Sequence, residues 1–259
     1  MGSGTGDPVV RRAAGAGWRP EDDIAPSLRH AARDAGAVLQ VRRSELAARV
    51  LHEQVPGVEL LALGLDGINT WLVETIPTWR ELLSIRPRTL STHVRMSLPN
   101  NRRVLRDGLR MVSIFDTESI HPAARVLVAH EPVGDYRFGV GPVQMKIADR
   151  RLLLLSGPVV DEDESLMLVT SGPCLEAAWR YWEAALASSY PARGSVPPPA
   201  DLTPRQHQVV ALLADDLGDD AIAEALGVSV RTVRSDVAAI LSALGVKSRF
   251  AAGLRLSSP

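Results

Sequence analysis

The chain has 259 residues, of which 46% are hydrophobic and 23% charged, as expected for one large folded domain or two unequal ones. Its 29 Lys and Arg nearly balance its 30 Asp and Glu, so the net charge of −1 excludes a chain that is basic throughout but not a local basic face. The single cysteine, Cys174, excludes an internal disulfide framework and a zinc site built from several cysteines. It also fits a reducing cytoplasm.

The sequence shows no segment for export or membrane insertion. Every apolar run is shorter than the ~18 residues of a membrane helix, and residues 1–12 lack the apolar centre of a signal peptide. We therefore expect a cytoplasmic protein without a membrane partner. Residues 1–26 are rich in Gly and Pro and are expected to form a disordered tail.

Residues 27–190 show the pattern of an α/β domain. Apolar residues at helical spacing, from Leu28 through Leu39 and Leu46 to Val50, predict a helix over 27–54, and a second helical segment precedes Pro77. Farther on, we predict strands over 81–86, 108–115 and 166–169, two strands within 142–156 that turn at 149–151, and helices over 99–107 and 173–189. This order predicts a mixed sheet of five or six strands with helices.

Two of the predicted helices have further features. Gly36 is a candidate interruption of the first helix. The apolar stripe of that helix has no obvious local cover, so it is a candidate dimerisation surface, the alternative being that it packs on its own sheet domain. In the helix over 173–189, Trp179 and Trp182 follow helical spacing and are assigned to the core. That face also carries Leu175, Ala178 and Leu186.

Residues 191–200 are predicted to be a linker, because Pro197, Pro198 and Pro199 form a semi-rigid spacer that cannot continue a helix. The second domain then covers 201–259. Thr203 is a good N-cap and Pro204 suits the first helical position. Apolar periodicity predicts four helices. The first begins at 204, and the others cover 219–226, 230–244 and 248–256. A turn at Gly227 and a cap at Ser229 give the helix-turn-helix pattern.

Four segments of this domain carry a resemblance in the right order and spacing. They are Leu202-Thr-Pro-Arg205, Ile222-Ala-Glu-Ala-Leu-Gly-Val-Ser229, Arg231-Thr-Val-Arg234 and Leu244-Gly-Val-Lys-Ser-Arg249. Together they resemble the LuxR-type helix-turn-helix module, a four-helix DNA-binding domain. The resemblance implies a transcription regulator whose recognition helix, about 230–244, enters the major groove. The DNA-binding residues that it implies are Ser229, Arg231, Thr232, Arg234, Ser235, Lys247 and Arg249. Of these, Arg231, Arg234 and Ser235 would lie at the groove, and Thr232, Lys247 and Arg249 would position the backbone.

The charge of this domain is polarised. Residues 201–228 carry one Arg against six acidic residues, whereas residues 229–259 carry five basic residues against Asp236 alone. Basic charge therefore gathers where DNA phosphates are expected. The acids Asp216, Asp219 and Asp220 depart from the family pattern and repel phosphate, so we expect affinity to depend on dimerisation. Asp236 could accept from a cytosine amino group; the alternatives are a surface charge or a partner of Arg234.

The first domain lacks the sequence motifs of two common kinds of regulatory domain. No strand ends in Asp at the spacing of a phosphoacceptor receiver, and no phosphate-binding Gly-rich loop precedes the linker. The segments Arg80-Glu-Leu-Leu-Ser-Ile-Arg-Pro87, Leu105-Arg-Asp-Gly-Leu-Arg110 and Val143 to Leu155, with the closing helix, instead resemble the phospholipase D-like sensor domain of actinobacterial LuxR-type regulators. Ser248-Arg-Phe-Ala-Ala-Gly253 also suits that group.

The phospholipase D reaction needs a His nucleophile with a Lys two residues later. Gln144-Met-Lys146 has Gln in the place of the nucleophile, and Ala123 and Pro132 follow His121 and His130 at that spacing. The resemblance therefore implies a degenerate domain with no catalytic residues, and we expect no metal or cofactor. Arg86, His93, Arg137, Gln144 and Lys146 are candidate polar liners of a ligand cleft, with Trp71 or Trp79 as walls; ordinary surface charge and core packing are the alternative.

The leading hypothesis is a DNA-binding transcription regulator modulated through its first domain. Its expected partners are double-stranded DNA and a second copy of the chain, with RNA polymerase and an unidentified small molecule as further candidates. One alternative is a phosphodiesterase-like enzyme with an accessory helical module, against which the missing His-x-Lys motif argues. Another is a ligand-free scaffold whose helical module docks on protein, against which the basic third and fourth helices argue.

Overall fold

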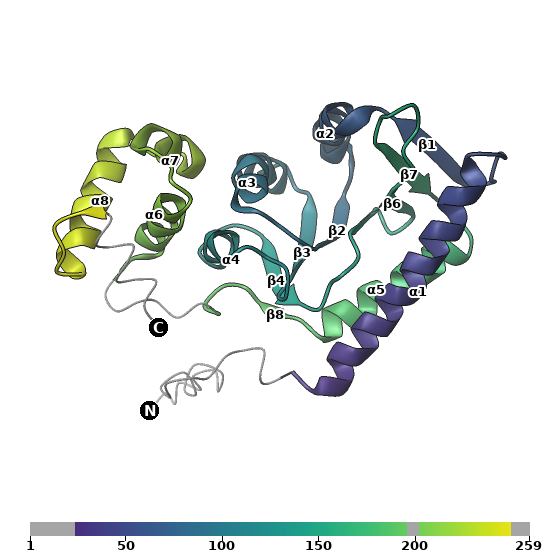
Figure 1. Cartoon of the computed structure of the whole chain (residues 1–259), viewed down its shortest axis with the longest axis horizontal. Coiled ribbons are helices and arrows are strands. Elements are labelled where there is room, and N and C mark those ends of the chain that lie inside the picture. The colour runs from purple at the N-terminus through teal and green to yellow at the C-terminus, as the bar shows by residue number, and fades with distance from the viewer. Residues whose placement is uncertain (1–23, 196–201, 250–259) are drawn as a thin grey trace.

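The computed structural model describes residues 24–195 and 202–249 (Figure 1). The predicted tail lies largely outside these residues, as does most of the helix predicted over 248–256. In chain order the elements are α1 (Pro26–Val50), β1 (Val58–Ala62), α2 (Gly64–Thr75), the 3₁₀ helix η2 (Ile76–Thr78), β2 (Glu81–Arg86), α3 (Ser91–Arg106), β3 (Arg110–Asp116), α4 (Pro122–Ala129), β4 (Asp135–Gly139), β5 (Met145–Ala148), β6 (Leu152–Ser156), β7 (Ser165–Val169), α5 (Pro173–Ala187), β8 (Tyr190–Pro191), α6 (Pro204–Ala214), α7 (Asp219–Leu226) and α8 (Val230–Ala243).

One mixed sheet organises the first domain, which confirms the predicted fold class. Its order is β1-β7-β6-β5-β2-β3-β4-β8. The strands β2, β3 and β4 are parallel and are joined by α3 and α4, while the other neighbours are antiparallel. The described sheet has eight strands rather than the predicted five or six, and the strands that were not predicted are β1, β4 and β8. β8 has only two residues, and β4 alternates charged with aromatic residues in place of an apolar run.

Helices cover both faces of the sheet (Figure 1). On one face α1 packs along α5, and a core containing Leu39, Tyr181 and Met145 lies beneath them. Gly36 does not interrupt α1; a Cβ there would lie 3.0 Å from the Tyr181 ring, so glycine permits the close approach of α1 to α5. The stripe of α1 is largely covered by its own domain, since Leu39 and Leu46 are buried, whereas Leu28 remains exposed. The opposite face carries α2, α3 and α4.

Two helices differ from their predicted form. The helix α3 begins at Ser91 rather than at 99, and Pro99 lies inside it. Proline lacks the backbone N–H and is tolerated in the first turn of a helix, where that N–H has no helical partner. The prediction from the sequence therefore starts the helix at Pro99. In α5, Trp182 is buried and Trp179 is partly buried, but Leu186 is exposed. The buried face of α5 is offset from the predicted one and consists of Cys174, Ala177, Ala178, Tyr181, Trp182 and Ala185.

The sheet domain continues into the segment predicted as a linker. Phe138 and Arg137 of β4 pair with Tyr190 and Pro191 of β8, so the linker does not begin at 191. Proline is tolerated there because β8 is an edge strand. Ser195 is also buried, and its hydroxyl donates to the carbonyl of Ala192 over 2.6 Å. Residues 196–201, with the proline triplet, lie outside the described ranges.

The helical domain docks on α4. The helix α6 packs against α4, and their apolar side chains form one continuous core with the sheet face. The segment Ala123–Ala129 of α4 is apolar on all sides apart from Arg125, as expected for a helix between a sheet and another helix. At the end of α4 the rings of His130 and His207 stack with centroids 4.6 Å apart, and Gln208 Nε2 lies 3.4 Å from the carbonyl oxygen of Leu127.

We expect this docking to weaken in acid. Burial, and secondarily the neighbouring His207, lower the pKa of His130 from 6.5 to about 4, so the docked state binds fewer protons than the undocked one. The docking constant should therefore fall as the pH drops from 6.5 towards 4, by up to about 30-fold between pH 7.5 and 5. Small-angle scattering of the whole chain would detect the separation of the domains, and His52→Gln, on an exposed histidine, should leave the response unchanged. Identical scattering at the two pH values would contradict the expectation.

Candidate nucleic-acid interface

The helices α7 and α8 form a helix-turn-helix whose ends are fixed by local chemistry. Thr203 caps α6, where its hydroxyl accepts from the backbone N–H of Gln206 over 3.3 Å. The turn uses Gly227 in the left-handed region at φ 66°, which glycine adopts without strain. Ser229 caps α8 by accepting from the N–H of Thr232 over 3.1 Å. The boundaries predicted for α7 and for the start of α8 are confirmed.

The residues of α8 divide between a buried and an open side. Val233, Val237 and Ile240 are buried against α6 and α7. Arg231, Arg234 and Ser235 are exposed on the other side. In Figure 1, α8 lies on the side of its domain away from the sheet, and α6 and α7 lie between them. The open side of α8 can therefore meet a large partner without separation of the two domains.

The other predicted contact residues lie at the two ends of α8. Ser229 and Thr232 are bound to each other through their hydroxyls, 2.8 Å apart, at the start of the helix. Lys247 and Arg249 are exposed beyond its end. The structure thus places cations along the exposed side of α8 and beyond its C-terminal end, which is an arrangement suited to phosphate oxygens.

Asp236 has none of the three roles considered for it in the sequence. Its side chain is 7% exposed and accepts two hydrogen bonds from the guanidinium of Arg205, at 2.6 and 3.1 Å. It is therefore neither a base-reading group nor a surface charge, and its partner is not Arg234. The pair fastens the start of α6 to α8, and the sequence could not reveal it because the two residues are 31 positions apart.

Arg234 and Arg249 instead share the carboxylate of Asp219. Arg234 Nε lies 3.3 Å from one oxygen of Asp219, and Arg249 Nη2 lies 2.8 Å from the other. The sequence singled out Asp219 only as an acid opposed to phosphate. Its proximity to two of the predicted DNA-binding residues depends on the packing of α7 against α8.

A second group of cations lies in the sheet domain. Lys146 of β5 is the register partner of Ser84 in β2, and Arg86 lies two residues along that strand, so both side chains share the face covered by α3. Burial, and then the neighbouring Arg86, lower the pKa of Lys146 to about 8. Arg86 donates to the Ser97 hydroxyl over 3.3 Å and lies over the Phe115 ring. Within 24–195 and 202–249 neither cation has a carboxylate partner.

The other predicted liners do not join this pair. Arg137 lies on the opposite face of the sheet, where its guanidinium donates to the hydroxyl of Ser189 over 2.7 Å. His93 is exposed near the start of α3, and its Nδ1 accepts from the N–H of Leu90 over 3.4 Å. Gln144 is exposed just before β5. Trp71 and Trp79 meet edge to face, 6.3 Å apart, and pack in the core beside α2.

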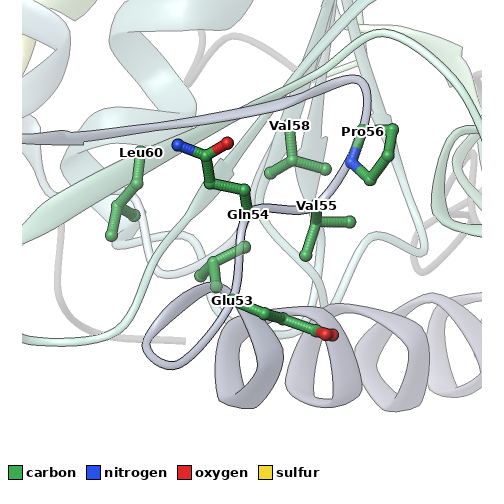
Figure 2. A pocket seen from close by; sticks show the side chains of 7 residues that line it. Glu53, Gln54, Val55, Pro56, Val58 and Leu60 are labelled. Carbon is green, nitrogen blue, oxygen red and sulfur yellow. The ribbon is translucent and has the colours of Figure 1, made fainter.

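A hollow of about 430 Å³ lies between the end of α1 and β1 (Figure 2). It is lined by Val50, Glu53, Gln54, Val55, Pro56, Val58 and Leu60. Its one charged side chain, Glu53, is already bound by Arg49 over 2.6 Å. The hollow lies at the end of the molecule opposite α8 (Figure 1) and contains none of the predicted site residues.

Within the described ranges, no helix is both long and apolar enough to cross a membrane. The same residues contain no group of three or more His, Cys, Asp or Glu arranged to hold a metal ion.

Comparison with known proteins finds a family match in the helical domain. Residues 200–254 match the family described as bacterial regulatory proteins, luxR family. No curated protein sequence is significantly similar to the chain.

Several solved structures show a weak likeness. Nuc from Salmonella typhimurium, a phospholipase D family member, has a TM-score of 0.40 at 10% identity, over 53% of this chain and 98% of its own. NucT from Helicobacter pylori has a TM-score of 0.41 at 16% identity, over 52% and 98%. TrmBL2, an archaeal chromatin protein, has a TM-score of 0.36 at 13% identity, over 58% and 60%. Likenesses at this level say nothing about the function of the chain.

Proposed function

Residues 200–254 belong to the luxR family of bacterial regulatory proteins, and we propose on that basis that the chain is a sequence-specific transcription regulator acting on DNA in the cytoplasm. The observation that carries the proposal is the exposed basic side of α8, with Arg231, Arg234, Lys247 and Arg249 open to a partner in the domain of that family. A protein-docking scaffold would not need this concentration of cations on and after the recognition helix.

The roles within the interface follow from position. Arg231, Arg234 and Ser235 lie on the exposed side of α8 near its start, where a recognition helix meets base edges. Thr232, Lys247 and Arg249 contact phosphates, and Ser229 holds the start of the helix. Two copies act together, because one recognition helix offers few base-reading side chains and the linked copies gain effective concentration on paired half-sites.

The first domain modulates this activity and is not itself an enzyme in our proposal. Gln144 cannot replace a histidine nucleophile, since a carboxamide forms no phosphoenzyme. Among the described residues the cations of Lys146 and Arg86 have no carboxylate partner and lie on one face of the sheet, which supports an anionic small molecule as the signal. The contact between α4 and α6 offers a physical route from this domain to the DNA-binding domain. RNA polymerase would be the downstream partner.

Arg234→Ala should weaken binding to a selected operator by about 1–3 kcal/mol while changing binding to unrelated DNA much less, because a base contact adds to specific binding only. Lys247→Ala should weaken binding to all sequences equally and lower the salt slope by about 1, because it removes one phosphate contact. The measurement is a fluorescence-anisotropy titration at several salt concentrations, with a duplex selected from a random pool by the wild-type protein.

Two further results decide the proposal. Sedimentation of the complex should show two chains per duplex. If the wild-type protein selects no sequence from the pool, the proposal of a sequence-specific regulator fails. If Arg234→Ala leaves the operator affinity unchanged, only the placement of the base-reading side of α8 fails.

A further inference from the structure

Two cations of the proposed DNA interface are bound to one carboxylate in the free protein. Asp219 accepts from Arg234 Nε at 3.3 Å and from Arg249 Nη2 at 2.8 Å. The Asp219 side chain is only 14% exposed, while Arg234 and Arg249 are 69% and 46% exposed. The carboxylate is therefore largely enclosed, whereas both guanidiniums stay within reach of a partner.

Asp219 lies where three segments of the domain meet. It is the first residue of α7, where the positive end of the helix dipole stabilises an anion. Arg234 comes from α8, and Arg249 follows the end of α8. One side chain thus joins three segments of the domain at the proposed DNA interface.

This arrangement makes DNA compete with an internal acceptor. A phosphate oxygen that takes Arg234 or Arg249 from Asp219 replaces one charge-assisted hydrogen bond by another, so the gain is small on any sequence. A guanine that binds Arg234 through two acceptors gains more than is lost. The same hydrogen bonds to Asp219 are broken on any sequence, so their cost lowers the specific and the non-specific affinity alike and cancels from the ratio of the two.

We propose that Asp219 is an affinity-limiting residue of the DNA interface, which holds Arg234 and Arg249 in the free protein and has to be displaced by DNA of any sequence. The inference rests on the proposed function and adds a role for an acid that otherwise only repels phosphate. It also explains how this acid can be compatible with a DNA-binding domain.

The neighbouring Asp220 provides a matched control. Asp220 is exposed, is the next residue of α7 and has no ion pair in the part of the chain that the structure describes. Asp219→Asn and Asp220→Asn remove the same charge from the same turn, so they change the general attraction to phosphate alike. Only Asp219→Asn frees the two guanidiniums.

The test compares the affinities of both variants and the wild type for the selected operator and for a scrambled duplex of the same composition. Asp219→Asn should raise affinity for both duplexes on the order of tenfold more than Asp220→Asn does. The ratio of specific to non-specific affinity should stay at the wild-type value in both variants. Asp219→Glu should restore part of the lower wild-type affinity by restoring the carboxylate.

Two outcomes would overturn the inference. One is equal behaviour of Asp219→Asn and Asp220→Asn. The other, which needs no variant of Asp219, is an Arg234 Nε–H that exchanges with water in the free protein as fast as that of Arg231, an exposed arginine on the same helix. A wild-type protein without any sequence preference would instead count against the proposed function, so the two failures are distinguishable.

Discussion

Arg102→Ala is expected to lower the free energy of unfolding by about 3–5 kcal/mol. The Glu131 side chain has no exposed surface, and Arg102 holds both of its oxygens, with Nε at 2.9 Å and Nη2 at 2.6 Å. Removing the guanidinium leaves a buried carboxylate without its cation, which costs far more than the net stability that the intact pair provides. Urea unfolding at pH 7, followed by circular dichroism, measures the loss.

The control for this prediction is the neighbouring arginine. Arg103 is exposed on α3, and its guanidinium is hydrogen-bonded to the amide oxygen of Asn100. Arg103→Ala should therefore change stability by less than about 0.5 kcal/mol. The double variant Arg102→Ala/Glu131→Leu should recover much of the loss, because no charge then stays buried. Equal effects of Arg102→Ala and Arg103→Ala would contradict the argument.

Lys146→Met, in contrast to Arg102→Ala, is expected to raise the free energy of unfolding at pH 7, by up to about 3 kcal/mol. Burial, together with the adjacent Arg86, lowers the pKa of Lys146 from 10.5 to about 8. The folded state thus loses its proton more readily than the unfolded state. The penalty is fully present below pH 8 and disappears as the pH rises through 10.5, so wild-type stability should increase over that range.

Unfolding at pH 7 and at pH 10 tests this account. The advantage of Lys146→Met should shrink to about 1 kcal/mol or less at pH 10, where folding no longer requires a buried charge. Lys247→Met, on an exposed lysine, should be neutral at both pH values. A gain that persists at pH 10 would point to better packing of methionine rather than to the removed charge.

The helix-turn-helix is the part that the sequence predicted most fully. Its boundaries depend on interactions between residues a few positions apart. Thr203 and Ser229 cap the helices that follow them, Gly227 makes the left-handed turn, and apolar residues recur at the helical period. In the sheet domain the strands with continuous apolar runs, such as β6 and β7, were also predicted, because burial on both faces requires such runs.

The tertiary structure alone decided which charges meet. Asp236 pairs with Arg205 across 31 positions, and Glu131 pairs with Arg102 across 29, which depends on how whole helices pack. The same holds for the short strands β1 and β8, which exist through their pairing with β7 and β4 rather than through propensity. Local chemistry therefore determined where the helices of the helical domain begin and end. Long-range packing determined which acid holds which cation, because one carboxylate can pair with any arginine that the fold brings within reach.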